Sequence, residues 1–524
     1  MALVMLLGTL LLTVSCGTGE EDPTKDSDSI TTGEQETERP LAYDTVEKQQ
    51  FDREFNILAR DDIAADFEVE DLTGELLDDM LYERNTKVAT DFDIEFSYYK
   101  MPYAEVNTTL NTQATSGSDD YDLYVGHKYS YGTCAQNNYC YNLGEIDTMD
   151  LTQPWWDQNC YANMTVNGRT YMITGDIFPS SMLTSSCLVF NRKMVKEMGK
   201  SDTALFEMAR NGGWTMDAMY DYCKDVSFDL NGDGNMSYTD DRYCLTSWMM
   251  DVPFSMYYAC NESFITIVDG TPELTYSTEK VINIYEKIYK IIVEQNSYFV
   301  TDLNLYATTY EPFVGGRAMF CDVTLSKITT FISEMNDPYG ILPMPKYDKN
   351  QAEYMSFVNG SSAMVMVAKT ESDIEFVGTI IEAMATFNYD NVTPKLFEVS
   401  TKLQAAQDPD SSAMVDYIVR NRIFDLAYFA DFDISNVVIN ALKEKSESIS
   451  SKMTAAARSS KTKLNRMIAQ FEKHELALLG NFHILRRVWR RIFCEFFRPR
   501  MTKKLLTEYE FSCIIKEAKC AYRE

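Results

Sequence analysis

Short apolar runs alternate with segments of helical periodicity along this chain, and this alternation restricts the possible folds more than any other feature. Residues 76–90 repeat apolar side chains at helical spacing. Apolar runs typical of strands cover residues 55–59, 94–99, 121–126 and 187–191. Strands that alternate with helices predict an α/β fold with a largely parallel sheet, in which the carboxyl ends of the strands form the ligand-binding edge.

The body of the chain, residues 41–473, is long enough for two lobes with separate hydrophobic cores. Within it, residues 166–176 are expected to form a hairpin with Asn167-Gly168 as its tight turn, because this pair accepts the positive φ angles of such turns. The many Tyr and Phe side chains suit contacts with sugars, although most aromatic residues of a globular body lie in its core.

Residues 2–16 form an apolar run that ends in Ser15-Cys16-Gly17. The run is too short for a membrane-spanning helix but suits the apolar part of a secretory signal. Its end resembles a bacterial lipobox, in which the signal is cleaved before the cysteine, here Cys16, and that cysteine is lipidated. Thr13 stands where the pattern favours Leu, and no basic residue precedes the run. A simple signal peptide and a buried apolar segment therefore remain alternatives, and the true start codon is expected further upstream.

Residues 17–40 are rich in Glu, Asp, Ser, Thr and Gly and hold a single aliphatic residue, Ile30. Such a segment cannot bury enough apolar surface to become ordered, so we expect a disordered acidic linker. The whole chain carries a net charge of −31, which repels nucleic acid and anionic lipid. The lipobox-like end at Cys16 and this linker together predict a globular body on the extracellular face of the cell membrane, held by a lipid anchor. The body is expected to be a monomer.

The chain contains 12 cysteines, of which Cys16 is assigned to the lipid and three lie beyond residue 490. The even number left in the body permits disulfides outside the cell, but spacing does not reveal their pairing. Cys134 and Cys140 are close enough in sequence to close a small loop, whereas all of these cysteines could equally be small buried apolar residues. No Cys-x-x-Cys pair or Cys/His cluster occurs, so zinc is not expected.

Five short motifs occur one after another between residues 166 and 345. Their sequences are Val166-Asn167-Gly168-Arg169-Thr170-Tyr171, Val189-Phe190-Asn191-Arg192-Lys193, Gly213-Trp214-Thr215-Met216-Asp217, Phe313-Val314-Gly315-Gly316-Arg317-Ala318-Met319-Phe320 and Tyr339-Gly340-Ile341-Leu342-Pro343-Met344-Pro345. In this order they resemble the family 1 extracellular solute-binding proteins, the receptors of ABC importers that include the maltose-binding protein. The chain looks most similar to the long lipoprotein members found in clostridia and their relatives.

The resemblance implies two α/β lobes that are joined by crossovers near residues 180–186 and 357–361 and close on a ligand between them. It divides the body into lobe 1, residues 41–182 and 360–400, and lobe 2, residues 183–359 and 401–473. It also implies a receptor without catalytic activity that binds a carbohydrate, above all an oligosaccharide, and delivers it to importer permease subunits. A peptide or another polar solute remains an alternative ligand.

The resemblance places a set of residues in the ligand cleft. They are Arg60, Asp61, His127, Tyr129, Asp176, Trp248, Tyr257, Asp322, Tyr428 and Phe432. Aromatic faces and charged or amide groups suit a sugar, which offers an apolar face and a ring of hydroxyls. Each residue also has an ordinary structural interpretation as a strand cap, a surface polar group or a core aromatic. Trp155-Trp156 suits structural packing better than a sugar platform.

Residues 229–240, DLNGDGNMSYTD, have the pattern of a calcium-binding loop. Calcium takes about 6–8 oxygen ligands, which such a loop supplies from alternating positions and from its last residue. The expected ligands are Asp229, Asn231, Asp233, the carbonyl of Asn235, Ser237 and Asp240. Asp in place of Glu at the last position predicts modest affinity, and a polar turn without metal is the alternative. Any bound calcium is expected to be structural.

Two other functions compete with transport. A surface carbohydrate adhesin or sensor could use the same fold, and so could a glycan-processing enzyme. Against an enzyme, residues 1–473 hold a single histidine, His127, and neither a Gly-x-Ser-x-Gly elbow nor an identifiable pair of catalytic carboxylates is present. The sequence therefore does not predict catalysis.

Residues 474–524 differ from the rest, since they carry eleven Lys or Arg and six Asp or Glu. Apolar residues recur at helical spacing over residues 484–497 with arginines opposite, which predicts a basic amphipathic helix suited to an anionic membrane surface. The resemblance ends near Lys473, so a frameshift or a missing stop codon is at least as good an explanation of this tail.

Overall fold

The computed structural model describes residues 40–396 and 409–492, with side-chain detail up to residue 473. The chain divides after Lys461 into two compact units. The first contains every strand of the described residues, and of the second the structure describes the continuation of helix α16 (Ser450–Ile492). The predicted signal, Cys16 and almost all of the linker lie outside the described residues, as does the tail beyond Ile492.

Lobe 1 is built on a four-stranded sheet with the order β12-β3-β1-β2. Its strands are β1 (Arg53–Arg60), β2 (Ile94–Met101), β3 (Leu123–Gly126) and β12 (Met364–Met366). β1 runs parallel to β2 and β3, and β12 runs antiparallel to β3. Phe55, Ile57 and Leu58 of β1 are all fully buried, which is typical of a parallel strand covered on both faces.

Lobe 2 is built on a five-stranded sheet with the order β10-β4-β9-β5-β8. Its strands are β4 (Ser186–Asn191), β5 (Tyr243–Trp248), β8 (Tyr298–Val300), β9 (Ala318–Thr324) and β10 (Tyr339–Leu342). β9 pairs in parallel with β5 and antiparallel with β4. Two short pairs complete the strands of the described chain, β6 (Ile265–Val268) with β7 (Thr271–Leu274), and β11 (Ser356–Phe357) with β13 (Arg422–Ile423).

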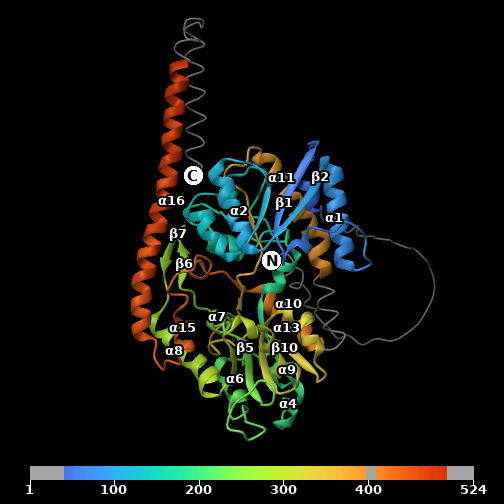
Figure 1. The fold of residues 1–524 in the computed structure, drawn as a ribbon, viewed down its shortest axis with the longest axis vertical. Helices are drawn as coiled ribbons and strands as arrows, with labels where there is room; N and C mark the ends of the chain where they lie inside the picture. The colour runs from blue at the N-terminus through green and yellow to red at the C-terminus, as the bar shows by residue number, and fades with distance from the viewer. Residues whose placement is uncertain (1–39, 397–408, 493–524) are drawn as a thin grey trace, which may run out of the picture. The chain divides into compact units, whose positions relative to one another are not determined.

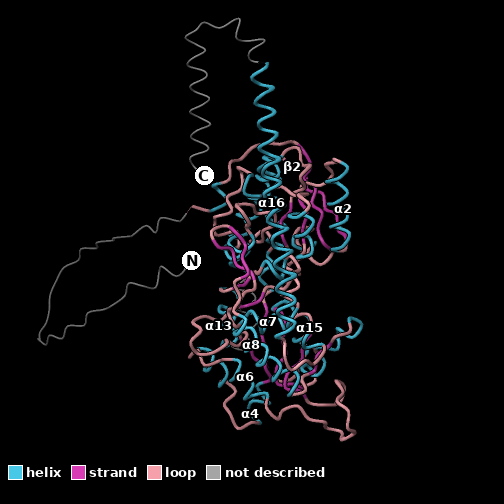
Figure 2. Tube along the Cα trace, turned by 90° about the vertical axis from the view of Figure 1, so that its left-hand side faces the viewer, coloured by secondary structure: helices cyan, strands magenta, loops and turns pink. Residues whose placement is uncertain are grey.

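Helices surround both sheets. They are α1 (Leu76–Phe92), α2 (Tyr103–Ser116), α3 (Gln158–Met164), α4 (Arg192–Glu197), α5 (Ala204–Arg210), α6 (Met216–Cys223), α7 (Val252–Ala259), α8 (Thr278–Tyr289), α9 (Glu311–Val314), α10 (Leu325–Thr330), α11 (Ile374–Phe387), α13 (Pro409–Arg420), α14 (Leu426–Phe429) and α15 (Val437–Lys443). In Figure 1, β1 and β2 are grouped with α1, α2 and α11, whereas β5 and β10 are grouped with α6, α9 and α13. The view in Figure 2 likewise shows the strands in separate groups.

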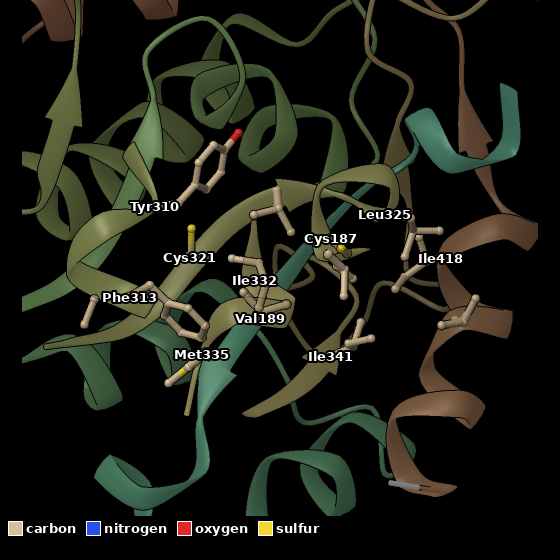
Figure 3. Close-up of a cluster of buried hydrophobic side chains, with 14 of the residues drawn as sticks. Cys187, Val189, Tyr310, Phe313, Cys321, Leu325, Ile332, Met335, Ile341 and Ile418 are labelled. Atoms are coloured by element: carbon tan, nitrogen blue, oxygen red, sulfur yellow. The ribbon is translucent and has the colours of Figure 1, made fainter. Parts of the chain in front are cut away.

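The core of lobe 2 lies between its sheet and helices α9, α10 and α13 (Figure 3). Cys187 and Val189 of β4 pack beside Cys321 of β9 and Ile341 of β10, and all are fully buried or nearly so. Cys160, Cys223, Cys244 and Cys260 are also free and buried. These thiols act as small apolar side chains, one of the two alternatives left open by the sequence. The structure joins Cys134 to Cys140 in a disulfide, which is the other alternative.

Two connections between the lobes lie side by side. The 3-10 turn Pro179–Thr184 leads into β4, and β11 leads through residues 358–363 into β12. Ser185 of the first connection pairs with Val358 of the second in an antiparallel bridge. Both fall at the positions expected for crossovers, while the residue boundaries of the two lobes stay a prediction.

Most expected elements of the first half are confirmed, with two differences. β3 begins two residues later than expected, at Leu123. The residue before it, Asp122, is tied to Asn56 of β1 by its carboxylate, which accepts the Asn56 N–H, and by its own N–H, which donates to the Asn56 carbonyl. The tight turn at Asn167-Gly168 is confirmed by φ angles of 51° and 71°. The hairpin over residues 166–176 is wrong beyond that turn, since Ile173 pairs with Val365 and Gly175 with Trp156.

Candidate functional site

The carboxyl ends of β1 and β3 lie at one edge of the lobe 1 sheet, because the two strands are parallel neighbours. The residues that follow them, Asp62 and Ile63 after β1 and residues 127–129 after β3, therefore meet at this edge. β12 runs antiparallel with Met364 opposite Gly126, so the second crossover, residues 359–361, arrives at the same place.

An equivalent edge exists in lobe 2. Ser186 at the start of β4 pairs with Thr324 at the end of β9, and β5 runs parallel to β9. The first crossover, the start of α10 and the residues after Trp248 are thereby brought together. Tyr306 joins them from the 3-10 segment Leu303–Thr309 that follows β8.

These edges enclose a cavity of about 460 Å³. Its lining comes from lobe 1, from both crossovers, from lobe 2 and from helix α14. The residues with functional side chains are Asp62, His127, Lys128, Tyr129, Ser180, Thr184, Trp248, Asp251, Tyr306, Thr324, Ser326, Lys327, Asn359, Ser361 and Tyr428. A second cavity of about 710 Å³ lies on lobe 1 around Trp155, Tyr389 and residues 40–47, without contribution from lobe 2.

Arg60 holds the lobe 1 side of the cavity in place. Its guanidinium is buried and donates to the carbonyl oxygens of Gly126 and Ser361, each at 2.6 Å. It also pairs with the Asp62 carboxylate at 2.8 Å, which holds the pKa of that carboxyl below its usual value against the opposing effect of burial. One side chain thus joins β1, β3 and the second crossover.

Aromatic rings line the cavity from both lobes. Tyr129 stacks on His127 with ring centroids 4.9 Å apart, and His127 stacks on Tyr103 at 5.0 Å. Tyr129 is 45% exposed, so part of its ring is accessible from the cavity. In lobe 2, Trp248 meets Tyr306 edge to face at 5.2 Å. Such faces are suited to the apolar face of a sugar ring.

Asp251 supplies an acceptor on the lobe 2 side. The Asn359 amide of the second crossover donates to its carboxylate at 2.6 Å. Burial raises the pKa of Asp251 to about 6, although Lys327, Asn359 and Lys128 act in the opposite direction. The Asn359 amide carries no charge, so its hydrogen bond ties lobe 2 to the second crossover without neutralising the Asp251 carboxylate.

The family model described as "Bacterial extracellular solute-binding protein" matches residues 83–386. The chain belongs to this family. An extracellular or periplasmic location follows, and the family resemblance drawn from the sequence motifs is confirmed. The search of curated proteins gave no significant match.

Solved structures share the fold of this solute-binding protein at low identity. The cyclic α-maltosyl-1,6-maltose binding protein of Arthrobacter globiformis is 13% identical with a TM-score of 0.51, over 78% of this chain and 98% of that protein. UspC of M. tuberculosis is 10% identical with a TM-score of 0.50, over 78% of this chain and 99% of UspC. The predicted two-lobe α/β fold is thereby confirmed. No helix in the described parts of the solute-binding protein has both the length and the apolar character needed to cross a membrane.

The structure brings together four of the residues placed in the cleft by sequence. His127, Tyr129, Trp248 and Tyr428 all line the cavity of the solute-binding protein. Arg60 lies behind the lining, where it positions neighbours, and Asp61 is exposed outside it.

The remaining predicted residues lie away from the cavity lining. Asp176 accepts the Thr393 hydroxyl at 2.9 Å, and Asp322 is buried in β9 against the Ser247 hydroxyl. Tyr257 stacks on Phe264 at 4.4 Å, and Phe432 is fully buried. Trp155 and Trp156 are buried and donate to Glu382, in keeping with structural packing. The structure therefore gives none of them direct access to a ligand in this cavity.

Several cavity residues were missed from the sequence. Lys128, Asp251, Tyr306, Lys327 and Asn359 all contribute to the lining. Lys128 and Asp251 stand directly beside predicted residues, so loop position alone was a usable signal for them. Tyr306 and Lys327 had no such signal, because they become neighbours of Trp248 only through the pairing of β5, β8 and β9.

The predicted calcium loop forms a series of tight turns. Asp229 accepts the N–H groups of Gly232 and Gly234 at 2.7 and 2.8 Å, and Asp233 accepts that of Asn235 at 2.7 Å. The buried carboxylate beside it is Asp241, which accepts the N–H groups of Leu230 and Ser237. Within the described side chains, no group of three or more His, Cys, Asp or Glu residues is arranged to hold a metal ion. Calcium binding stays a prediction.

We expect His127 to remain neutral far below its usual pKa. Burial, together with Arg60 and Lys128, lowers the pKa of His127 to about 3, below the unfolded value of 6.5. The folded state then binds fewer protons, so the stability from this group is complete above pH 6.5 and decreases as the pH falls towards 3. Compared with His127→Asn, which keeps an acceptor for the Tyr129 N–H, the wild type should lose about 1.4 kcal/mol of unfolding free energy per pH unit in this range. Urea unfolding of both proteins between pH 4 and 8 measures this, and parallel curves would contradict the assignment.

Proposed function

We propose that this solute-binding protein is a lipid-anchored receptor that binds a carbohydrate in its cleft and delivers it to the permease of an ABC importer. The supporting observation is the cavity whose lining comes from both lobes and both crossovers. A ligand there touches both lobes at once, which favours the closed state by the difference in its affinity for the two states. Closure then presents a distinct surface to the permease.

The lining favours a carbohydrate as the ligand. Tyr129 and Trp248 supply ring faces, while Asn359, Ser326 and Thr324 supply polar groups that can meet hydroxyls. The protein from Arthrobacter globiformis that shares the fold is described as binding a cyclic maltosyl-maltose, which supports the same ligand class. The family consists of binding proteins, and a receptor without catalysis needs only contacts of this kind.

Isothermal titration of the full-length protein against a panel of oligosaccharides tests the proposal. We expect one glycan class to bind with a Kd of about 1 μM or below, with no product formed and with a smaller radius of gyration in solution scattering. Trp248→Ala should weaken binding, whereas Phe228→Ala, which truncates a 63% exposed aromatic outside the cavity, should not. A folded protein that binds no glycan would overturn the carbohydrate assignment, and turnover would overturn the receptor.

We also propose that residues 229–240 bind calcium in a structural role. Asp229, Asn231 and Asp233 offer side-chain oxygens within one turn, and the positive φ of Gly234 allows the chain to fold around an ion. Calcium at about 100 times its Kd should raise the unfolding free energy by about 2.7 kcal/mol. Thermal unfolding with calcium, with magnesium and with chelator measures the effect. An equal response in Asp229→Asn/Asp233→Asn protein would show that this loop is not the site.

A further inference from the structure

Among the described residues, Lys128 is a buried cation with no salt bridge, although Asp431 and Asp251 act on it electrostatically from a longer distance. Its side chain is 7% exposed and lines the cavity, with Nζ 3.6 Å from the ring centroid of Tyr428 and 4.9 Å from that of Tyr129. Among the described residues no carboxylate lies within ion-pair distance of Nζ, and no acceptor takes a hydrogen bond from it. The two rings stabilise the ammonium only in part, because a buried charge needs a partner of opposite charge to offset its lost hydration.

A second lysine reaches the same cavity from the other lobe. Lys327 of α10 is partly buried in the lining and likewise has no salt bridge within the described chain. Of the two carboxylates of the lining, Asp62 pairs with Arg60, and Asp251 accepts the Asn359 amide. Asp251 also acts electrostatically on Lys128 and Lys327, but from beyond ion-pair distance. Within the part of the chain that the structure describes, the cavity therefore offers two ammonium groups without a salt bridge, one on each lobe, beside the rings of Tyr129 and Trp248.

We propose that the ligand is an acidic oligosaccharide, whose carboxylate or sulfate ester is bound by Lys128 and Lys327. This inference rests on the proposed carbohydrate-binding function and narrows it. The anionic group would supply the partner that Lys128 lacks, and it would draw the two lobes together because the lysines belong to different lobes. The sugar rings would then lie against Tyr129 and Trp248.

The test compares ligands that differ in charge alone. Full-length protein is titrated with galacturonate, glucuronate and mannuronate oligomers, with their methyl esters, and with sulfated and unsulfated oligomers of galactose. We expect an acidic member to bind at least about 30-fold more tightly than its uncharged counterpart, as for a buried charge pair that loses one partner. Preference for uronates over sulfate esters, or the reverse, identifies the anionic group.

Two variants separate the outcomes. Lys128→Met keeps the length of the side chain and should abolish the preference for the acidic ligand. Lys327→Met should reduce this preference, and it provides the test if the Lys128→Met protein folds poorly. Equal binding of acidic and neutral forms of one glycan would overturn this inference and leave the proposed function standing. A folded protein that binds no member of either series would overturn both.

Discussion

Alanine in place of Gly360 should weaken ligand binding about tenfold or more and lower the unfolding free energy by only about 1–2 kcal/mol. A Cβ at this position would lie 2.3 Å from Cδ of Lys128 and 2.9 Å from Oη of Tyr428. Overpacking of this kind costs about 1–3 kcal/mol, part of which is relieved when a flexible stem moves. Here the stem that moves carries the Lys128 ammonium, so the cavity changes more than the fold does.

Titration and urea unfolding of the same Gly360→Ala preparation measure the two effects. Gly132→Ala is the matched control, because a Cβ there comes no closer than 4.0 Å to a neighbouring atom and needs no unusual φ. Unchanged affinity in Gly360→Ala would mean that the Lys128 stem can leave Gly360 without moving its ammonium. That result would show that a side chain at position 360 does not affect ligand binding.

Truncation of Glu382 to alanine should destabilise lobe 1 by about 3–5 kcal/mol. The buried Glu382 carboxylate accepts the indole N–H of Trp155 at 2.8 Å and that of Trp156 at 3.1 Å. Its removal leaves two buried donors without an acceptor, and each costs about 1–3 kcal/mol, in addition to the cavity. Glu375→Ala on the same helix, α11, truncates an exposed side chain and should change stability by about 0.5 kcal/mol at most.

The effect of Glu382→Ala should also depend on pH. Burial raises the pKa of Glu382 to about 7 from 4.5, even though the indole bonds act in the opposite direction. The folded protein then holds a proton that the unfolded chain releases, so stability from this group is complete below pH 4.5 and falls as the pH rises to 7. The variant's deficit, measured by urea unfolding, should be about 2–3 kcal/mol larger at pH 5 than at pH 8. A deficit independent of pH would place the carboxyl pKa near its ordinary value.

Local pattern was sufficient to predict the strands of lobe 1 and the residues at their carboxyl ends. β1 carries an apolar run that ends at Arg60, and His127 and Tyr129 follow β3 directly, so the parallel arrangement placed them correctly at one edge. Lys128 was overlooked because a lysine in a loop is normally solvated. Its burial comes from Tyr428, a partner that no local sequence window contains.

Where every neighbour is apolar, the sequence does not reveal which way a side chain points. All eight residues of α7 are buried, so nothing in their pattern distinguished Tyr257, which faces Phe264, from a ligand contact. In β9, Asp322 is fixed inward by Ser247, and the residue that reaches the cavity is Thr324. The order of the strands in the sheet decides these positions, and it depends on pairings between distant segments.

The second crossover is held by hydrogen bonds from three directions. Arg60 donates to the Ser361 carbonyl, the Lys128 N–H donates to the Gly360 carbonyl, and the Gly360 N–H donates to the Tyr428 hydroxyl. The conformational entropy of this segment is therefore lost during folding and not on binding, even though the segment lines the cavity. Ligand binding should then carry little entropic penalty from ordering the hinge. The affinity for the ligand should then depend on the contacts in the cavity and on the closing motion of the lobes.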